Sequence, residues 1–163
     1  MFTGLPLALH PPNPAIRLRR ARLTDADALH QTCWPERSFG PVYQLLSRAN
    51  QYFGAGRGAG FVLLSEDENP IGFGQFTLWP TCAEISDLIV AETYRGQGRG
   101  TALIQHIAQE ARRIGATTLE IGAALDNPRA LALYHRLGFT DSHVVHLLNG
   151  IESVQYLRLT ING

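Results

Sequence analysis

Three glycines at alternate positions stand out in the run Tyr-Arg-Gly-Gln-Gly-Arg-Gly-Thr at residues 94–101. The run follows an apolar stretch at 85–90 and opens a stretch at 101–114 with helical apolar spacing. Glycine has no side chain and costs backbone entropy, so these glycines suit a backbone that bends sharply and approaches a ligand closely. The N–H groups at a helix start are unpaired and favour phosphate. The run therefore predicts a diphosphate cradle, with charge supplied by Arg95 and Arg99.

The spacing of these glycines excludes two common phosphate-binding loops. A P-loop ends in Gly-Lys-Ser/Thr, whereas Gly100 is followed directly by Thr101. The dinucleotide fingerprint G-x-G-x-x-G also fails, because its last position falls on Thr101 or Leu103 from either starting glycine. The pattern that fits is R-x-x-G-x-G, which starts at Arg95 and ends at Gly100. The predicted phosphate site therefore belongs to neither of these two classes.

Length and charge limit the kind of protein further. A chain of 163 residues suits one domain with a real core. The formal net charge is zero, from 14 basic and 14 acidic residues, which argues against a nucleic-acid-binding protein. No apolar run approaches the roughly 18 residues of a membrane span, and the N-terminus lacks a secretory pattern. We expect a flexible proline-rich tail at 1–14 and a single cytoplasmic domain at 15–163.

Neither the cysteines nor the histidines form a metal-binding pattern. Cys33 and Cys82 are too few for a disulfide framework and lack metal-ligand spacing. His143 and His146 are close in sequence, but strand alternation would place them on opposite faces. We therefore expect free thiols and no metal site.

Apolar periodicity and turn residues predict the order β-α-α-β-β-β-α-β-α-β-β. The expected strands lie at 16–23, 61–64, 71–78, 83–90, 117–125, 144–148 and 153–161. The expected helices lie at 24–32, 41–52, 101–114 and 127–138, and the glycine-rich segment 54–60 is expected to be a loop. The first helix would have Thr24 as its N-cap. This order indicates an α/β fold with a mixed sheet and antiparallel hairpins, rather than a doubly wound parallel sheet.

Two segments resemble the GNAT N-acetyltransferase superfamily. The first is the strand at 85–90 with the glycine run at 94–101. The second, Asn-Pro-Arg-Ala-Leu-Ala-Leu-Tyr-His-Arg-Leu-Gly-Phe at 127–139, is similar to the family's N-x-x-A-x-x-x-Y-x-x-x-G-F segment. The element order is similar over about residues 15–161, and the opening at 16–19 is similar in character only. The resemblance implies the GNAT acyl-CoA N-acyltransferase fold and direct acetyl transfer from acetyl-CoA to a primary amine in a ternary complex.

The same resemblance implies a set of cofactor-binding residues. In the family, a backbone N–H on the strand before the glycine loop stabilises the thioester oxygen, and the loop N–H groups bind the pyrophosphate. The residues implied for acetyl-CoA are Leu88, Ile89, Val90, Arg95, Gly96, Gln97, Gly98, Arg99, Gly100, Thr101, Asn127, Ala130 and Tyr134. An ordinary strand-to-helix turn is the alternative for the glycines, and a plain N-cap role for Asn127 is compatible with binding.

Three residues are candidates for proton transfer. The resemblance assigns Tyr134 as the general acid for the departing thiolate, whereas a core tyrosine is the alternative. Glu84 and Asp87 are candidate bases for the acceptor ammonium, and a water chain is the third option. Asp87 shares its alternation face with the apolar Ile85 and Ile89, so it is out of pattern unless a β-bulge intervenes.

The acceptor is expected to be a small molecule or a peptide with a primary amine. Its binding residues are expected to be Trp34, Glu36, Phe39 and Trp79, because aromatic rings beside a carboxylate suit an amine with an apolar body. Core packing is the alternative for both tryptophans. No nucleic acid or membrane partner is expected, and a homodimer is compatible with the resemblance. The rival functions are transfer from a longer acyl-CoA and a non-catalytic acyl-CoA-binding module.

Overall fold

The chain folds around a mixed sheet with helices on both faces. The computed structural model describes residues 13–148 and 150–161, and its elements follow the predicted order. The strands are β1 (Arg17–Arg20), β2 (Gly58–Leu64), β3 (Pro70–Leu78), β4 (Ala83–Val90), β5 (Thr118–Ala124), β6 (Thr140–His146) and β7 (Ser153–Thr160). The helices are α1 (Ala26–Cys33), α2 (Phe39–Gly54), α3 (Arg99–Arg113) and α4 (Pro128–Arg136), with short 3-10 helices η2 (Leu23–Asp25) and η3 (Glu92–Tyr94).

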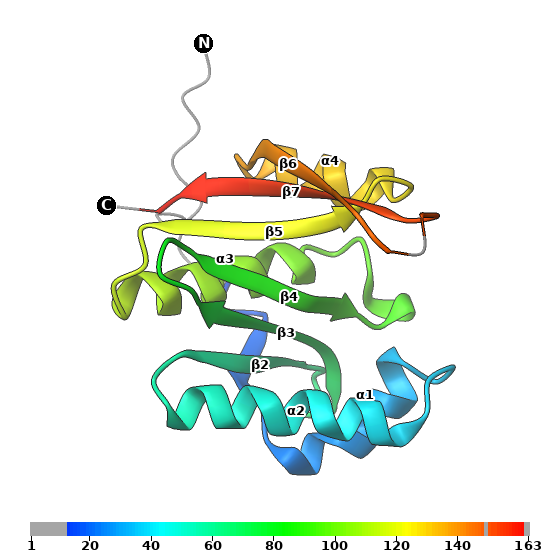
Figure 1. Cartoon of the computed structure of the whole chain (residues 1–163). Helices are drawn as coiled ribbons and strands as arrows, with labels where there is room; N and C mark the ends of the chain where they lie inside the picture. The colour runs from blue at the N-terminus through cyan, green and yellow to red at the C-terminus, as the bar shows by residue number, and fades with distance from the viewer. Residues whose placement is uncertain (1–12, 149, 162–163) are drawn as a thin grey trace.

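The sheet combines one parallel pair with antiparallel hairpins. Its strand order is β1-β2-β3-β4-β5-β7-β6 (Figure 1). Strands β4 and β5 run parallel, and the other described neighbours run antiparallel. A crossover connection is needed between parallel strands, and α3 supplies it between β4 and β5. The predicted mixed α/β sheet is thereby confirmed.

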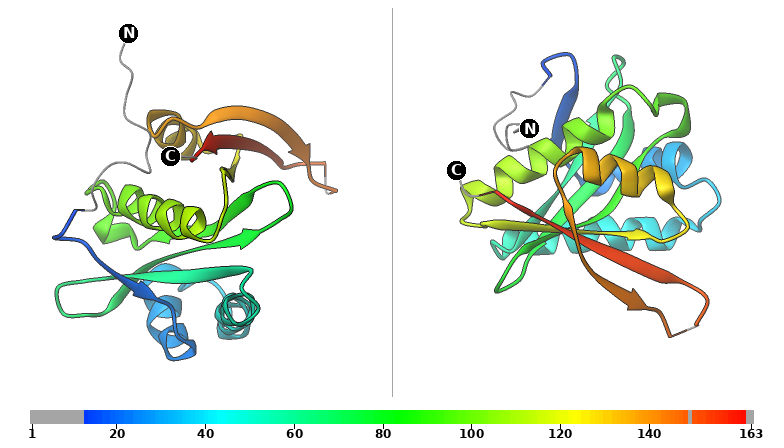
Figure 2. Two further views of the ribbon diagram at one scale, coloured as in Figure 1. Left: turned by 90° about the vertical axis from the view of Figure 1, so that its left-hand side faces the viewer. Right: turned by 90° about the horizontal axis from the view of Figure 1, so that it is seen from above.

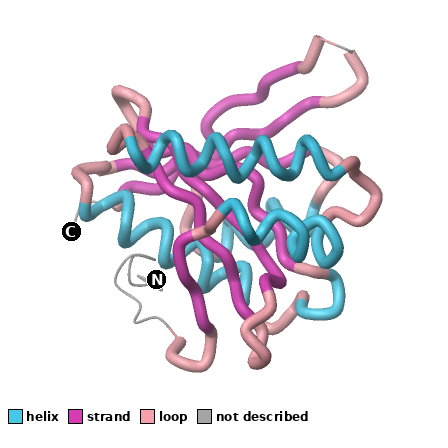
Figure 3. Tube along the Cα trace, turned by 90° about the horizontal axis from the view of Figure 1, so that it is seen from below, coloured by secondary structure: helices cyan, strands magenta, loops and turns pink. Residues whose placement is uncertain are grey.

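The helices cover the two faces of the sheet unequally. Helices α1 and α2 lie over the β1–β3 half of one face, and α3 and α4 lie on the opposite face (Figures 1 and 2). Figure 3 shows α1 and α2 in front of the strands. Leu46 of α2 and Leu103 and Ile107 of α3 are fully buried, so each helix turns an apolar stripe to the sheet. Among the described elements, no helix covers β5, β6 or β7 on the α1/α2 face (Figure 1).

No described helix is both long enough and apolar enough to cross a membrane. The predicted N-terminal tail lies outside the described residues, except for Asn13 and Pro14. At this point the backbone N–H of Ile16 donates to the Asn13 carbonyl at 3.0 Å, and the N–H of Ala15 donates to the Asn13 side chain at 3.0 Å.

The glycine-rich segment 54–60 is only partly a loop, because β2 begins at Gly58. A side chain on Gly60 would place its Cβ 3.0 Å from the Cβ of Ala49 and 3.1 Å from the Phe73 ring. Glycine at this position lets α2 approach the strand closely. The prediction of a loop was wrong here because composition does not distinguish a flexible glycine from one required by packing.

Two other strands differ from their predicted bounds. β1 ends at Arg20 rather than at residue 23, because the chain turns into η2 before α1 begins at Ala26. Thr24 therefore lies inside η2 and is not the N-cap of α1. β6 covers Thr140–His146 rather than 144–148. All of its residues are exposed, so pairing with β7 defines it and no burial alternation marks it.

A buried ion pair fixes the connection between β1 and α1. The Arg19 guanidinium donates to both carboxylate oxygens of Asp25 at 2.8 Å, and the Arg22 N–H donates to the same carboxylate at 2.8 Å. The Asp25 side chain is only 6% exposed. Burial alone would raise the pKa of Asp25, but the hydrogen bonds from Arg19 and Arg22 outweigh it and lower the pKa.

We expect Asp25→Asn to lower the free energy of unfolding by about 2 kcal/mol at pH 7, because it leaves the half-buried Arg19 without its charged partner. Since the folded-state pKa is lowered, this stabilisation is complete above the ordinary carboxyl pKa of about 4. It is lost as the pH falls through the folded-state pKa. Urea denaturation at pH 7 and pH 3 measures both effects. Arg17→Gln, which removes the exposed pair with Glu68, is the control and should cost less than about 0.5 kcal/mol.

Candidate functional site

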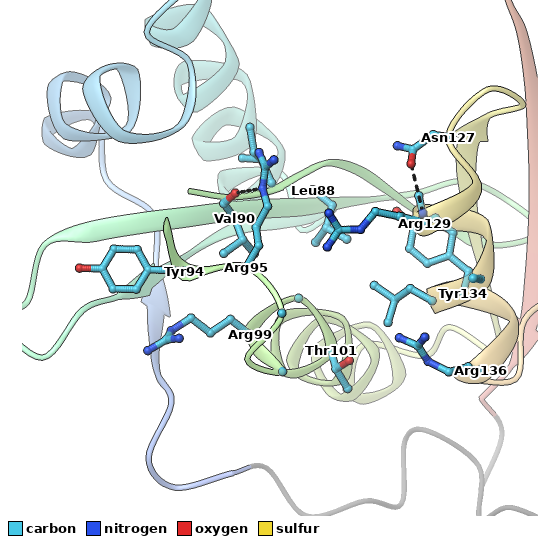
Figure 4. Close-up of a pocket in the computed structure, with 17 residues that line it drawn as sticks. Leu88, Val90, Tyr94, Arg95, Arg99, Thr101, Asn127, Arg129, Tyr134 and Arg136 are labelled. Carbon is cyan, nitrogen blue, oxygen red and sulfur yellow. Dashed lines mark hydrogen bonds between the residues drawn. The ribbon is translucent and has the colours of Figure 1, made fainter. Parts of the chain in front are cut away.

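A pocket of about 630 Å³ lies at the end of β4, between the starts of α3 and α4 (Figure 4). It is lined by every residue implied for the cofactor except Gln97. The lining also contains five residues that were not among those implied for the cofactor, namely Tyr94, Arg129, Ala132, Leu133 and Arg136. The two segments that carry the sequence resemblance, 94–101 and 127–139, therefore lie on opposite walls of one pocket.

The glycine loop leads directly into α3. Gly96 and Gly98 have φ angles of 75° and 78°, in the left-handed region that favours glycine, and Gly98 is the N-cap of the helix. Gly100 differs, because it lies inside α3 and a Cβ there would meet only the Leu133 side chain, at 3.9 Å. Neither backbone conformation nor packing requires glycine at position 100. Its missing side chain instead leaves the pocket wall open beside the first N–H groups of the helix.

Strands β4 and β5 separate next to this pocket. They pair only from Ala83 to Ile85 on β4, opposite Leu119 to Ile121 on β5. The register between β3 and β4 then shifts opposite Phe73 and Gln75, which marks a β-bulge. The N–H of Ala91 donates to Ile71 on β3 at 2.8 Å. Strand alternation therefore directs the N–H groups of Leu88 and Val90 away from β3, toward the gap that β5 has left.

The pocket carries a concentration of positive charge. Arg95 donates from Nε to the Val90 carbonyl at 2.8 Å. The guanidinium carbon of Arg99 lies 5.1 Å from the centroid of the Tyr94 ring, and its Nη1 donates a hydrogen bond to Oε1 of Gln97. Arg129 and Arg136 extend from α4 on the opposite wall (Figure 4).

Among the described residues that line the pocket, none is Asp or Glu. A protein with no formal net charge therefore has four arginines around one pocket, an arrangement that favours a polyanion such as a diphosphate.

Tyr134 lies on the α4 wall and is 7% exposed. Helix α4 begins at Pro128, and the Asn127 side chain accepts a hydrogen bond from the Ala130 N–H at 3.2 Å. Burial raises the pKa of Tyr134 to about 12, so its phenol stays protonated at neutral pH. A protonated phenol at a pocket wall can donate a hydrogen bond or a proton to a bound group.

The two candidate bases lie on the α1/α2 side of the sheet. Gln75 donates from Nε2 to Oδ2 of Asp87 at 2.6 Å, and Asp87 has a φ of 55°. The bulge therefore explains why Asp87 breaks the apolar alternation of its strand. Glu84 lies three positions earlier, about 10 Å along the strand. Burial and repulsion from Glu120 raise the pKa of Glu84, and a hydrogen bond with the Trp79 side chain opposes the shift.

The residues predicted for the acceptor do not all lie together. Trp34 is 4% exposed and its ring contacts Phe73, so it belongs to the core. Glu36 and Phe39 are exposed in the connection from α1 to α2 and at the start of α2. This connection is near the start of β3, because Thr32 donates to the Pro70 carbonyl at 3.0 Å. Trp79, 45% exposed, follows the other end of β3.

A comparison with known proteins also brings the two walls of the pocket together in one family pattern. A model of the Acetyltransferase (GNAT) family matches residues 23–139, which include both walls of the pocket. This chain belongs to the GNAT family.

Similar members of the family are known from sequence and structure. The chain is 38% identical over 63 residues to an uncharacterized N-acetyltransferase of Methanocaldococcus jannaschii, covering 39% of this chain and 28% of that protein. It is 34% identical over 62 residues to the ribosomal protein bS18-alanine N-acetyltransferase of Escherichia coli K12, covering 38% and 42%. The chain therefore spans less than half the length of these two relatives.

A putative acetyltransferase from Salmonella typhimurium, solved with its cofactor acetyl-CoA, superposes with a TM-score of 0.72 at 22% identity, covering 91% of this chain and 95% of that one. At this identity the likeness shows a shared fold. Across residues 13–148 and 150–161, no three His, Cys, Asp or Glu side chains gather so as to hold a metal ion.

Proposed function

We propose that this GNAT chain is an acetyl-CoA-dependent N-acetyltransferase that transfers an acetyl group directly to a primary amine. One observation carries the proposal: the glycine loop and the protonated Tyr134 line the same pocket, with the outward N–H groups of β4 between them. This places donors for phosphate at one end and a proton donor at the other. The names of the matched relatives support the same activity.

The charge of the pocket and its open wall suit coenzyme A. The N–H groups at the start of α3 would bind the diphosphate, with Arg95 and Arg99 beside it. The open wall at Gly100 provides the close approach that this binding requires. Arg129 and Arg136 would bind a further phosphate from the opposite wall. When bound, acetyl-CoA supplies an acetyl thioester, which the gap between β4 and β5 would receive.

Each step of the transfer has a residue in reach of that gap. Asp87 would accept a proton from the acceptor ammonium and free the amine to attack the thioester carbon. The N–H of Leu88 or Val90 would stabilise charge on the carbonyl oxygen. The N–C bond would form and the C–S bond would break as Tyr134 gives its proton to the departing sulfur. The second proton lost from the nitrogen would then restore the Tyr134 phenol. No covalent enzyme adduct is needed.

Asp87 fits the base better than Glu84 does. Asp87 lies one residue before Leu88, at the point where β4 leaves β5, and is exposed to an approaching amine. Glu84 still pairs across to Glu120 on β5 and lies near Trp79. We assign Glu84 to attraction of the cationic acceptor rather than to proton transfer. A cytoplasmic location belongs to the same proposal, in keeping with the free thiols of Cys33 and Cys82.

An amine panel with acetyl-CoA tests the proposal, with free thiol release as the measurement. The panel contains peptides with an N-terminal alanine or serine, a lysine peptide, spermidine, an aminoglycoside and free amino acids. We expect thiol release above background with at least one amine, and mass spectrometry should show the added acetyl group. Coenzyme A binding by calorimetry without thiol release for any amine would indicate a binding module instead. Faster thiol release from a longer acyl-CoA would show that this acyl-CoA, rather than acetyl-CoA, is the preferred donor.

We expect Arg129→Gln together with Arg136→Gln to weaken coenzyme A binding by about 100-fold, because each removes a charge-assisted contact of about 1.5 kcal/mol. If these arginines bind the 3′-phosphate, the double variant should weaken the binding of dephospho-coenzyme A less than it weakens the binding of coenzyme A. Calorimetry at two salt concentrations measures both ligands, and the wild type should show the steeper salt dependence. Arg48→Gln, an exposed arginine on α2, is the matched control. Equal affinity in the double variant and the control would contradict this assignment.

A further inference from the structure

Gln75 is a polar residue in the most buried strand of the sheet. Every residue of β3 except Leu78 at its end is buried, and Gln75 itself is 5% exposed. Its neighbours Phe73 and Phe76 are core residues with 0% and 2% exposure. An amide in such a place costs free energy unless its donors and acceptor are all hydrogen-bonded. An apolar side chain of similar volume would therefore suit this position better if packing alone decided it.

The Gln75 amide has only part of its hydrogen-bonding capacity satisfied. Its Nε2 donates to Oδ2 of Asp87 at 2.6 Å. Its Oε1 is fully buried and, within the described residues, has no hydrogen-bond partner. Two buried carboxylates of the chain are paired with arginines instead, Asp25 with Arg19 and Glu120 with Arg158. The buried Gln75 amide therefore contributes a hydrogen bond to Asp87 that an apolar side chain at position 75 could not make.

Asp87 is itself held in a costly conformation. Its φ of 55° is uncommon for a residue other than glycine, and its carboxylate is on the exposed side of the β4 bulge. Across from the bulge is Gly74, where a Cβ would lie only 2.9 Å from Cδ1 of Leu88. A bulge, a left-handed aspartate, a closely packed glycine and a buried amide therefore meet at one point, beside the gap between β4 and β5.

We infer that Gln75 is a positioning residue that fixes the Asp87 carboxylate for proton transfer; this rests on the role proposed for Asp87. With Oδ2 engaged by the buried amide, Oδ1 is left to meet the acceptor amine. An aspartate on an exposed bulge would otherwise rotate about its side-chain torsions. A hydrogen bond from a rigid strand restricts that rotation and holds the carboxylate in one orientation. Gln75 thus acts through Asp87 and touches neither substrate.

Gln75→Leu tests this inference against a purely structural role. With acetyl-CoA and the fastest amine of the panel, we expect kcat/KM for the amine to fall at least tenfold, while KM for acetyl-CoA stays unchanged. The loss should lie in kcat rather than in KM for the amine, because Gln75 orients the base and does not bind the amine. The melting temperature should stay the same or rise, because an unsatisfied buried amide is removed. Gln75→Glu should lower kcat as well, because a carboxylate at position 75 repels Asp87 instead of donating a hydrogen bond to it.

Thr77→Val is the matched control, a buried polar residue on the same face of β3 that should leave kcat for the amine unchanged. Carbodiimide labelling of Asp87 with glycinamide at a single pH, followed by mass spectrometry, gives a readout that needs no acceptor. Asp87 should be labelled at a different rate in Gln75→Leu than in wild type, because the amide no longer holds its carboxylate. Identical labelling rates would overturn the inference about Gln75. Wild-type turnover in Asp87→Asn would instead overturn the proposed base, whatever the labelling shows.

Discussion

Replacing Tyr134 by Phe is expected to lower kcat by about 100- to 1000-fold, the usual range for losing a positioned general acid. The phenol is the group on the α4 wall that can protonate a departing thiolate, and its pKa of about 12 keeps the proton in place at neutral pH. Phe retains the ring, whose centroid lies 6.1 Å from that of Phe139, so the core stays filled. The rate should therefore fall without a comparable loss of stability.

Three measurements separate this effect from a general disturbance of the pocket. Calorimetry should give the same affinity for coenzyme A in Tyr134→Phe and wild type. The melting temperatures should agree closely, since the change removes one hydroxyl. In the wild type, titration of Tyr134 should not cause an alkaline decline of kcat below about pH 10, because its pKa lies well above that range. Unchanged kcat in the Phe variant would show that water protonates the sulfur.

The second large effect concerns Gly100. We expect Gly100→Ala to weaken coenzyme A binding about tenfold and Gly100→Val about 100-fold, because each added carbon occupies the wall where the ligand approaches the first N–H groups of α3. At the same time, Gly100→Ala should stabilise the free protein by about 0.5–1 kcal/mol, since alanine suits a helix better than glycine. The two effects have opposite signs.

Because binding should weaken while stability rises, a substitution at Gly100 tests the phosphate cradle more clearly than a substitution at Gly98. Gly98 has a φ of 78°, so any replacement there strains the backbone. A loss of binding in such a variant could not be separated from misfolding. Gly54→Ala, at the end of α2 with nothing within 4 Å of its Cβ, is the control for helix stabilisation alone. Calorimetry measures affinity and thermal unfolding measures stability. Retained affinity in Gly100→Val would show that the glycine run is merely a turn.

Local patterns predicted the pocket well. The alternate glycines and the segment from Asn127 to Phe139 are short, and each places its residues on a helix start whose geometry is fixed locally. Arg129 and Arg136 were missed, although a signal for them existed. They lie seven positions apart with Leu133 between them, on one stripe of α4 that faces the pocket. A helical projection of 128–136 would have shown this stripe.

Long-range pairing accounts for what the sequence did not predict. Gln75 and Asp87 meet because β3 and β4 pair across a bulge, and no local pattern specifies which residues face each other there. Asp87 did reveal itself as out of pattern, whereas Gln75, which lies between Gly74 and Phe76, gave no comparable signal. β6 has all of its residues exposed, so its position at the sheet edge depends on β7 rather than on its own sequence.

The separation of β4 from β5 has a consequence for how acceptor choice can change. Under the proposed function, acetyl-CoA approaches from the α3/α4 face and the amine from the α1/α2 face, and they meet in the gap beyond Ile85. No helix of the described part of the chain covers β5, β6 or β7 on the α1/α2 face (Figure 1), which would leave a large acceptor room there. Substitutions on that face can alter the acceptor while the cofactor wall stays intact. Under the proposed function, the two specificities are thus free to evolve independently.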